Sequence, residues 1–304
     1  MKAASRDITT ELGLVLLAAI WGVNFSVVKV VLEELGPLAL NALRFPLAAA
    51  ALWLVLRGRT GPSLPTRADL PRVVLLGLIG NVGYQLCFIF GIDWTRAGNA
   101  SLLLATTPVW TVILSTLMGH ERPNRWVVVG VLGTLLGITL VVLGRGDEIS
   151  LGSVTLRGDL LMVAASMLWS TYTVGGYRLV ARYGALRMTA WTLWIGTPCL
   201  VAMGIRELIA TDLAAISTGT WLGVVYAGLL SIGLAYLLWY RGVQRLGNSR
   251  TAVYSNLVPV AALTTAWLWL GEVPTPIQIL GATVILLGLT VARITQLPES
   301  SALR

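Results

Sequence analysis

The two halves of this chain repeat each other, and each half contains an odd number of apolar segments. Residues 91–139 align without a gap on residues 242–290, at a constant offset of 151 residues. The identical aligned positions include Gly91/Gly242, Pro108/Pro259, Glu121/Glu272, Pro123/Pro274, Gly130/Gly281, Leu135/Leu286, Leu136/Leu287, Gly137/Gly288 and Thr139/Thr290. Upstream, an offset of 148 residues pairs Trp21 with Trp169, Gly36 with Gly184, Leu38 with Leu186 and Ala42 with Ala190. Two copies that each cross a membrane an odd number of times must be inserted upside down relative to each other.

The composition predicts a helical membrane protein. Hydrophobic residues make up 56% of the 304 residues and charged residues only 12%, against about 25% charged residues in soluble domains. Ten apolar blocks approach the roughly 20 residues that a helix needs to cross a bilayer. These blocks are 12–32, 37–56, 70–92, 97–118, 126–144, 159–180, 187–206, 219–240, 250–270 and 276–295. We therefore expect an all-α integral membrane protein with ten transmembrane helices as two inverted five-helix repeats.

The distribution of lysine and arginine predicts the orientation of these spans. If the N-terminus is cytoplasmic, 16 basic residues fall in inside segments and four in outside segments. Cytoplasmic loops carry this excess of positive charge, so we expect both termini in the cytoplasm. The polar segment Arg145–Gly158 separates the halves, which places the first repeat at residues 1–146 and the second at residues 147–304. The expected location is the inner (plasma) membrane, with the lipid bilayer as the surrounding partner.

Several function classes are disfavoured by the sequence. The net charge of +8 is scattered between apolar blocks, so we expect no nucleic-acid partner. One histidine and two separate cysteines make no metal-ligand pattern, and no phosphate-binding loop is present. We therefore expect no cofactor, no metal and no catalytic residues, and no obligatory protein partner is evident. An intramembrane enzyme stays a remote alternative, because it would need a nucleophile–base pair or a metal cluster at depth.

Polar and aromatic side chains at mid-depth mark the expected binding site. A polar group near the bilayer centre needs a partner or a water-filled cavity. In the third apolar block Asn81, Tyr84 and Gln85 lie on one helical stripe, and the first and sixth blocks show the same spacing. The candidate substrate-binding residues are Trp21, Asn24, Arg44, Asn81, Tyr84, Gln85, Thr106, Trp110, Trp169, Tyr172, Trp191, Tyr226, Tyr254 and Asn256. Interhelical hydrogen bonding and core packing are the alternatives for each member.

Two prolines occupy matching places in the two halves. Pro108 and Pro259 are expected inside helices, where a proline removes a backbone donor and leaves a carbonyl without its partner. Paired interruptions of this kind point to the binding site of a transporter, so both prolines are candidate gating or hinge residues. A simple kink that shapes the bundle is the alternative. The glycine row Gly130, Gly133 and Gly137 predicts close helix packing.

Two cations lie within predicted spans and have no cationic counterpart in the other half. Lys29 is four residues before Glu33, so a local ion pair is one interpretation. Arg44 lies seven residues into the second block, roughly 10 Å along the helix. We hypothesise that Arg44, together with Lys29, attracts a substrate carboxylate. No acidic residue or histidine is found at mid-depth, so facilitated or exchange transport is expected rather than a carboxylate proton relay.

A set of motifs marks the first helix pair and the end of each repeat. These are Trp21-Gly22-Val23-Asn24-Phe25, Lys29, Pro37-Leu38, Leu43-Arg44-Phe45, Pro108, Glu121, Gly130, Gly137, Pro259, Gly271-Glu272 and Gly281. In these motifs the chain resembles EamA-type carriers of the drug/metabolite transporter superfamily. Two departures are His120, where the family often has glycine, and Ser170, where the first half has Gly22. The resemblance covers nearly the whole chain and is more specific for the superfamily than for a substrate.

The resemblance implies a ten-helix inner-membrane carrier that works by alternating access. Its cavity is expected mainly between spans 3, 4, 8 and 9, flanked by spans 1, 2, 6 and 7. Within the family, exporters of aromatic amino acids and of threonine and homoserine are the best match to an aromatic and amide-lined cavity. The expected function is therefore export of amino acids, aromatic ones included, and related small metabolites. A multidrug exporter of lipophilic compounds is the alternative, and a channel is a further one.

Overall fold

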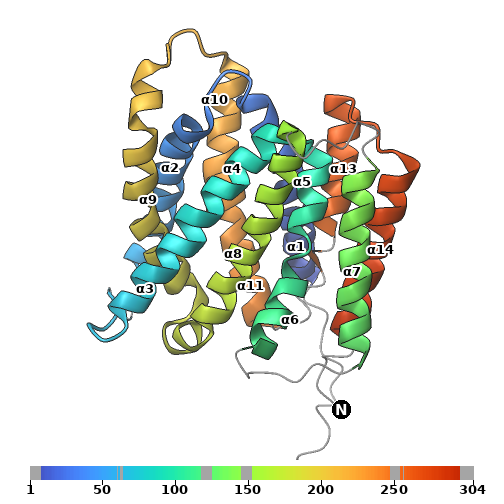
Figure 1. Ribbon diagram of the computed structural model, residues 1–304. Helices are drawn as coiled ribbons and strands as arrows, with labels where there is room; N and C mark the ends of the chain where they lie inside the picture. Colours follow the sequence, from blue (N-terminus) through green and yellow to red (C-terminus); the bar gives the residue numbers. More distant parts are fainter. Residues whose placement is uncertain are drawn as a thin grey trace, which may run out of the picture.

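The computed structural model describes residues 8–59, 61, 64–117, 125–144, 153–246, 254–255 and 257–294. All regular secondary structure in these ranges is helical, as the sequence predicts. The helices are α1 (Ile8–Val31), α2 (Pro37–Arg57), α3 (Leu70–Gly77), η1 (Leu78–Gly83), α4 (Tyr84–Trp94), α5 (Ala97–Leu104), α6 (Thr107–Leu117), α7 (Arg125–Leu143), α8 (Val154–Tyr183), α9 (Ala185–Ala210), α10 (Thr218–Val225), η2 (Tyr226–Leu234), α11 (Ala235–Leu246), α13 (Leu257–Leu270) and α14 (Pro276–Ile294). They lie side by side in one bundle (Figure 1).

Within the described residues, six helical stretches are long and apolar enough to cross a membrane. They are Ile8–Val31, Pro37–Arg57, Leu70–Trp94, Ala97–Leu114, Ala185–Ala210 and Thr218–Trp239. Shorter apolar helices cover Val128–Leu143, Leu257–Leu270 and Pro276–Gly288. The helix α8 has 30 residues, but the run Ser170–Thr173 makes its middle more polar. The ten-span arrangement and the side on which the termini lie therefore stay predictions.

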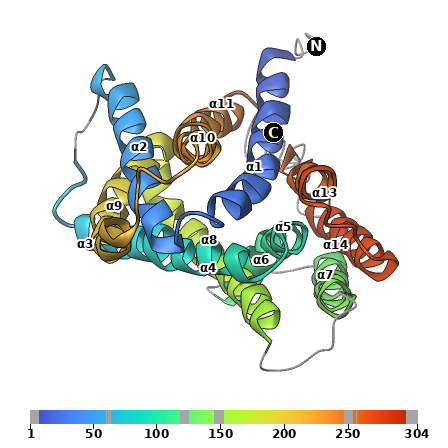
Figure 2. The same ribbon diagram turned by 90° about the horizontal axis from the view of Figure 1, so that it is seen from above.

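Helices of the first half pack against helices of the second half throughout the bundle. The helix α2 lies along α9 at one edge of the bundle, and α7 lies along α14 at the opposite edge (Figure 2). Between these edges, α1 packs on α13, and its repeat counterpart α8 packs on α6. Each contact joins the first half to the second, so the halves share one interior. The predicted boundary between residues 146 and 147 falls outside the described residues.

Local signals in the sequence explain where several helices begin. The helix α2 starts with Pro37 after Gly36, a place where the missing proline N–H would have no partner in the helix. Thr275 and Gln278 form a reciprocal capping box at the start of α14, because each side chain accepts the other's backbone N–H. Ser153 caps α8 by accepting a hydrogen bond from the backbone N–H of Leu156.

Carboxylates of one half cap helices of the other half. Glu207, at the end of α9, accepts hydrogen bonds from the backbone N–H groups of Leu38 and Ala39 at the start of α2. Glu272, which follows α13, accepts from Ala97 and Gly98 at the start of α5. Helix N-termini carry partial positive charge, so both contacts are electrostatically favourable. These hydrogen bonds tie the first turns of α2 and α5, in the first half, to carboxylates of the second half.

The predicted close packing at the glycine row is confirmed at the contact between α7 and α14. A Cβ atom added to Gly137 would lie 2.8 Å from the carbonyl oxygen of Gly281. A Cβ atom added to Gly281 would lie 2.9 Å from the carbonyl oxygen of Gly137. The two backbones approach so closely that neither position has room for a side chain, as in other membrane helix pairs built on small residues.

The two matched prolines lie at helix beginnings, not in helix interiors. Regular α-helix stops at Leu104 and resumes at Thr107, so Pro108 is the second residue of α6. Pro259 is the third residue of α13. A proline in the first turn removes an N–H that would have no intrahelical partner. The prediction that each proline lies inside a helix and leaves a backbone carbonyl without its partner is therefore wrong. The predicted interruption of the helix is present beside Pro108 in the first half.

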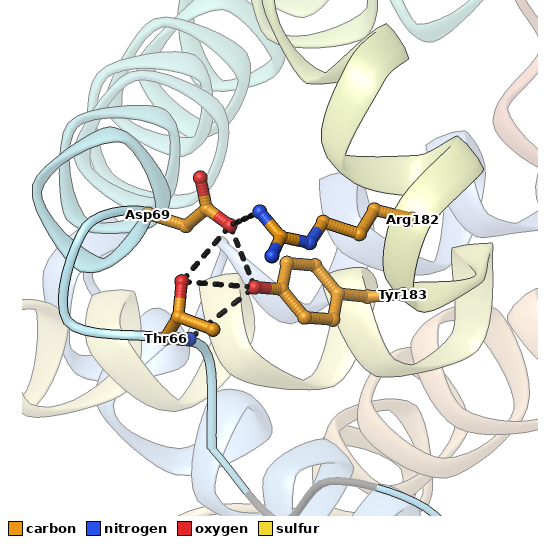
Figure 3. A network of polar contacts seen from close by, with 4 residues as sticks. All are labelled: Thr66, Asp69, Arg182 and Tyr183. Atoms are coloured by element: carbon orange, nitrogen blue, oxygen red, sulfur yellow. Dashed lines mark hydrogen bonds and ion pairs between the residues drawn. The ribbon is translucent and has the colours of Figure 1, made fainter.

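A polar network ties the loop before α3 to the end of α8 (Figure 3). The hydroxyl of Tyr183 donates a hydrogen bond of 2.6 Å to Asp69 Oδ2. The same oxygen accepts from Thr66 Oγ1 at 3.1 Å and from Arg182 Nη1 at 2.8 Å. These contacts lower the pKa of the Asp69 carboxyl, with the Tyr183 hydrogen bond as the largest cause. The network connects the first half to the second at this end of the bundle.

We expect Asp69→Asn to lower thermal stability slightly at neutral pH and to have no effect in strong acid. A carboxyl with a depressed folded-state pKa stabilises the fold above its unfolded pKa, and this stability is lost as pH falls through the folded value. Melting temperatures of the two proteins in detergent, compared from pH 7 down to about pH 2, below the depressed pKa of Asp69, measure the difference. A gap that persists unchanged in acid would contradict this origin.

Candidate functional site

Arg44 is the centre of a buried polar group that joins α2 to α4. Its side chain is only 2% exposed. Nε donates a hydrogen bond of 3.0 Å to Asn41 Oδ1, and Nη2 donates one of 2.9 Å to Gln85 Oε1. The guanidinium also lies 5.7 Å from the ring centroids of Phe45 and of Phe88, which is within cation–π range. The structure thus gives Arg44 neutral partners, and two of its five N–H donors are used in these hydrogen bonds.

An aromatic row lies next to this polar group and joins α4 to α8. The ring centroids of Tyr84 and Phe88 are 5.7 Å apart, and those of Tyr84 and Trp169 are 4.9 Å apart. Trp169 continues the row to Tyr172 at 5.3 Å. Because Phe88 also contacts the Arg44 guanidinium, the cation and the aromatic row form one continuous group. Five predicted residues, Arg44, Tyr84, Gln85, Trp169 and Tyr172, are brought together here.

A second group of predicted residues lies on α1. The indole of Trp21 donates a hydrogen bond to the carbonyl of Ser231 in η2, and its ring lies 6.3 Å from that of Tyr236. Tyr226 donates to the carbonyl of Ile20. Tyr254 packs against the same cluster of side chains around Leu17. These contacts join α1 to the η2–α11 helix, so the candidates here already have structural partners.

A third group surrounds the interruption between α5 and α6. The Thr106 hydroxyl donates to the carbonyl of Leu103 and accepts from the indole of Trp110 at 3.2 Å. It also lies 3.3 Å from the hydroxyl of Ser166 in α8. Ser170, one turn further along α8, donates to the carbonyl of Thr107. Hydroxyl groups of α8 therefore satisfy backbone and side-chain groups at the place where the α5–α6 helix is broken.

The remaining candidates are spread over other parts of the bundle. Trp191 packs edge-on against Tyr183 in a hydrophobic cluster with Val73. Asn81 is buried in η1, where its Cβ faces Gly196 of α9. Asn24 is buried in α1, and its Oδ1 has no hydrogen-bond partner among the described residues. Asn256 lies outside the described residues.

Lys29 caps a helix and does not join the Arg44 group. Its ammonium donates three hydrogen bonds to backbone carbonyls at the end of α4, those of Ile92, Asp93 and Thr95, at 2.9, 2.7 and 2.8 Å. A cation is favourable there because a helix C-terminus carries partial negative charge. The ammonium therefore hydrogen-bonds these carbonyls in place of the predicted local pair with Glu33, and a substrate role shared with Arg44 finds no support in this placement. Spacing could not reveal it, because the three carbonyls belong to a different helix.

Sequence reasoning also missed two π-helical segments at matching places in the repeat. The segments η1 and η2 begin at Leu78 and Tyr226, and 226 − 78 gives the same offset of 148 that aligns the upstream parts of the two halves. Each contains an aligned glycine, Gly80 or Gly228. A Cβ at Gly80 would meet the ring of Tyr172, and one at Gly228 would lie 2.8 Å from the carbonyl oxygen of Arg44. Both wide turns therefore contact candidate site residues, and such turns are frequent at functional sites.

Cavities among the described residues lie outside the Arg44 group. One of about 380 Å³ lies between the end of α2 and the start of α9, lined by Leu56, Gly58, Arg59, Tyr183, Gly184, Leu186 and Arg187. The other, of about 130 Å³, lies where α5 meets α14 and includes Asn99 and Gln278. The Arg44 and aromatic side chains are packed against one another instead of lining either space.

Comparison with known proteins supplies the family. Residues 8–143 and residues 156–294 each match the EamA-like transporter family, so the match covers both halves. The chain belongs to the EamA-like transporter family. It is therefore a transporter of the drug/metabolite superfamily and not an enzyme, and it is a multi-pass membrane protein with a small-molecule substrate.

Relatives of this EamA-like transporter include exporters. It is 30% identical to a probable terminal-alkyne amino-acid exporter of Streptantibioticus cattleyicolor, over 90% of each chain. It is also 30% identical to a probable amino-acid metabolite efflux pump of Escherichia coli, over 90% of this chain and 91% of that one. A solved crystal structure matches with a TM-score of 0.67 at 21% identity and covers 94% of this chain and 97% of its own. That likeness concerns the fold alone.

Proposed function

We propose that this EamA-like transporter is an inner-membrane exporter of amino acids, aromatic ones included, and related small metabolites. It works by alternating access between two inverted five-span halves, with residues 1–146 as the first half and both termini in the cytoplasm. The relatives named as amino-acid exporters support the substrate class. The excess of arginine and lysine in the predicted inside segments supports the orientation.

The observation that carries the proposal is the buried guanidinium of Arg44 beside the aromatic row. An amino acid with an aromatic side chain offers a carboxylate and an apolar ring, and these two features match the two parts of the group. Trp169 and Tyr172 come from the second half, whereas Arg44 and Tyr84 come from the first. A ligand that contacts both parts would therefore bridge the halves, as a substrate of an alternating-access carrier must. Pro108 and Pro259 are proposed to mark the ends of the helices that move.

Counterflow in proteoliposomes tests this function. Purified protein is reconstituted with unlabelled phenylalanine inside, and entry of labelled phenylalanine is followed with and without a pH gradient. We expect trans-acceleration that needs the protein and that does not change when the gradient is removed. Threonine and a lipophilic cation such as tetraphenylphosphonium complete the panel. Exchange of the lipophilic cation without exchange of amino acids would instead identify a multidrug carrier, and substrate-dependent proton flux would exclude simple exchange.

A further inference from the structure

The direction of the hydrogen bonds around Arg44 fixes which atoms its neighbours can offer a ligand. Arginine only donates hydrogen bonds, so Asn41 and Gln85 must both turn their amide oxygens towards it. Their NH₂ groups are then left to find acceptors elsewhere. Asn41 is fully buried, and its Nδ2 has no hydrogen-bond partner among the described residues. A buried donor without an acceptor is rare in native structures and needs an explanation.

The unpaired Asn41 donor lies beside the guanidinium. Its Nδ2 and Oδ1 are bonded to the same carbon, and Oδ1 is only 3.0 Å from Arg44 Nε. Asn41 also lies three residues before Arg44 on α2, so both side chains project from one face of the helix. Arg44 keeps N–H donors that its two hydrogen bonds do not use. A ligand with two adjacent acceptor atoms and a negative charge would satisfy this arrangement, and a carboxylate has these properties.

The carboxylates whose hydrogen bonds are described are used at helix ends and in connecting turns. Glu34, Glu207 and Glu272 accept from helix N-termini, and Asp69 and Asp159 accept from the hydroxyls of Tyr183 and Thr95. The groups around Arg44 are instead amides and aromatic rings. An ammonium group entering here would lose its hydration and meet a fixed positive charge, which is unfavourable in a low-dielectric interior.

We propose that Arg44 and Asn41 together bind the substrate carboxylate, and that the site selects apolar monocarboxylates without requiring an α-amino group. This inference rests on the proposed export function and names its substrate class more narrowly. Aromatic 2-hydroxy acids, 2-oxo acids and N-acylated amino acids fit the site at least as well as the amino acids themselves. Gln85 acts as a positioning residue, because its oxygen holds one side of the guanidinium fork.

A panel of three ligands with the same phenyl ring tests the selection. Phenylalanine has both charged groups, 3-phenyllactate has only the carboxylate, and 2-phenethylamine has only the ammonium. In competition against labelled phenylalanine in proteoliposomes, phenyllactate is expected to be at least as effective as phenylalanine. Phenethylamine is expected to be about tenfold weaker or worse, the difference that loss of charge-assisted hydrogen bonds produces. The same order is expected for ligand-induced shifts of melting temperature in detergent.

The variant Asn41→Asp tests the second ligand group. It keeps the shape of the side chain, replaces the donor with a carboxylate oxygen and neutralises Arg44, so affinity for both acids should fall about tenfold or more. The matched control is Asn99→Asp. Asn99 is also buried, accepts one hydrogen bond from Gln278 and has a buried Nδ2 without a described partner, but it lies in the group where α5 meets α14. The Asn99→Asp variant should leave ligand selectivity unchanged.

The outcomes separate the inference from the function. If phenylalanine shows counterflow but phenethylamine competes as well as phenyllactate, the substrate class is wrong and the exporter function stands. The inference also fails if Asn41→Asp and Asn99→Asp have equal effects on affinity. It fails again if phenylalanine outcompetes phenyllactate. Loss of that preference in Asn24→Leu would then assign the ammonium to the buried Asn24 Oδ1. If no amino acid or acid is exchanged or bound by the folded protein, the proposed function itself is wrong.

Discussion

Arg44→Gln is expected to abolish the preference of the transporter for carboxylate ligands. The sharpest comparison is 3-phenylpropanoate against 3-phenylpropanamide, which have nearly the same shape and differ in charge. Hydrogen bonds to a charged group contribute about 1.5–3 kcal/mol, so affinity for the acid should fall about tenfold to a hundredfold. Affinity for the amide should change little, because glutamine can still donate to Gln85 and leaves that amide satisfied. Competition against labelled substrate measures both affinities.

The control for this substitution is Arg206→Gln, at an exposed position near the end of α9. It removes the same charge without touching the buried group and should leave both ligands unaffected. Arg44→Lys should not restore the wild-type preference, because lysine keeps the charge but lacks the planar fork that contacts Asn41 and Gln85 together. Equal losses for the acid and the amide in Arg44→Gln would show that Arg44 supports packing rather than selection.

The second large effect is expected from Gly137→Ala at the contact between α7 and α14. Its Cβ would lie 2.8 Å from the carbonyl oxygen of Gly281 and from the backbone nitrogen of Ile285. The two helices must separate to admit it, and overpacking of this kind costs about 1–3 kcal/mol. Loss of melting temperature in detergent, followed by the tryptophan signal or by size-exclusion chromatography after heating, measures the destabilisation.

Gly133→Ala is the matched control, on the same helix and one turn earlier. The nearest atom to its added Cβ is the Cα of Gly288 at 3.8 Å, an ordinary van der Waals distance. Alanine favours helix over glycine by about 1 kcal/mol, so this variant should be neutral or more stable. Similar destabilisation by both variants would mean that helix α7 does not approach α14 as closely as the structure describes.

The sequence predicted the elements that depend on composition and periodicity. Apolar blocks and repeat identities were sufficient for the helical class, for the family and for the glycine contact of Gly137 with Gly281. The stripe of Asn81, Tyr84 and Gln85 was predicted from their i, i+3, i+4 spacing on one helix, and Tyr84 and Gln85 do reach the Arg44 group. Composition, helix spacing and repeat identities can all be read from the order of residues in a single sequence.

Contacts between distant segments could not be predicted in this way. Lys29 could be assigned to Glu33 by spacing, but its three carbonyl acceptors are set by how α1 meets the end of α4. Asn41 was overlooked beside Arg44, although a separation of three residues was a usable signal. Pro108 was placed inside one continuous helix, whereas α5 ends at Leu104 and α6 begins at Thr107, because apolar length does not show where the backbone ladder stops and restarts.

The π-helical segment η1 sets the direction in which the side chains that follow it point. An α-helix turns by about 100° per residue, so one extra residue within a turn rotates everything after it by about that angle. The part before η1 packs on α9, whereas the part after it packs mainly on α8. Deleting one residue from Leu78–Gly83 would leave a helix of almost the same length and apolarity. The deletion would turn Gln85 away from Arg44. The helix could still cross a membrane, but the contact between Gln85 and Arg44 would be lost.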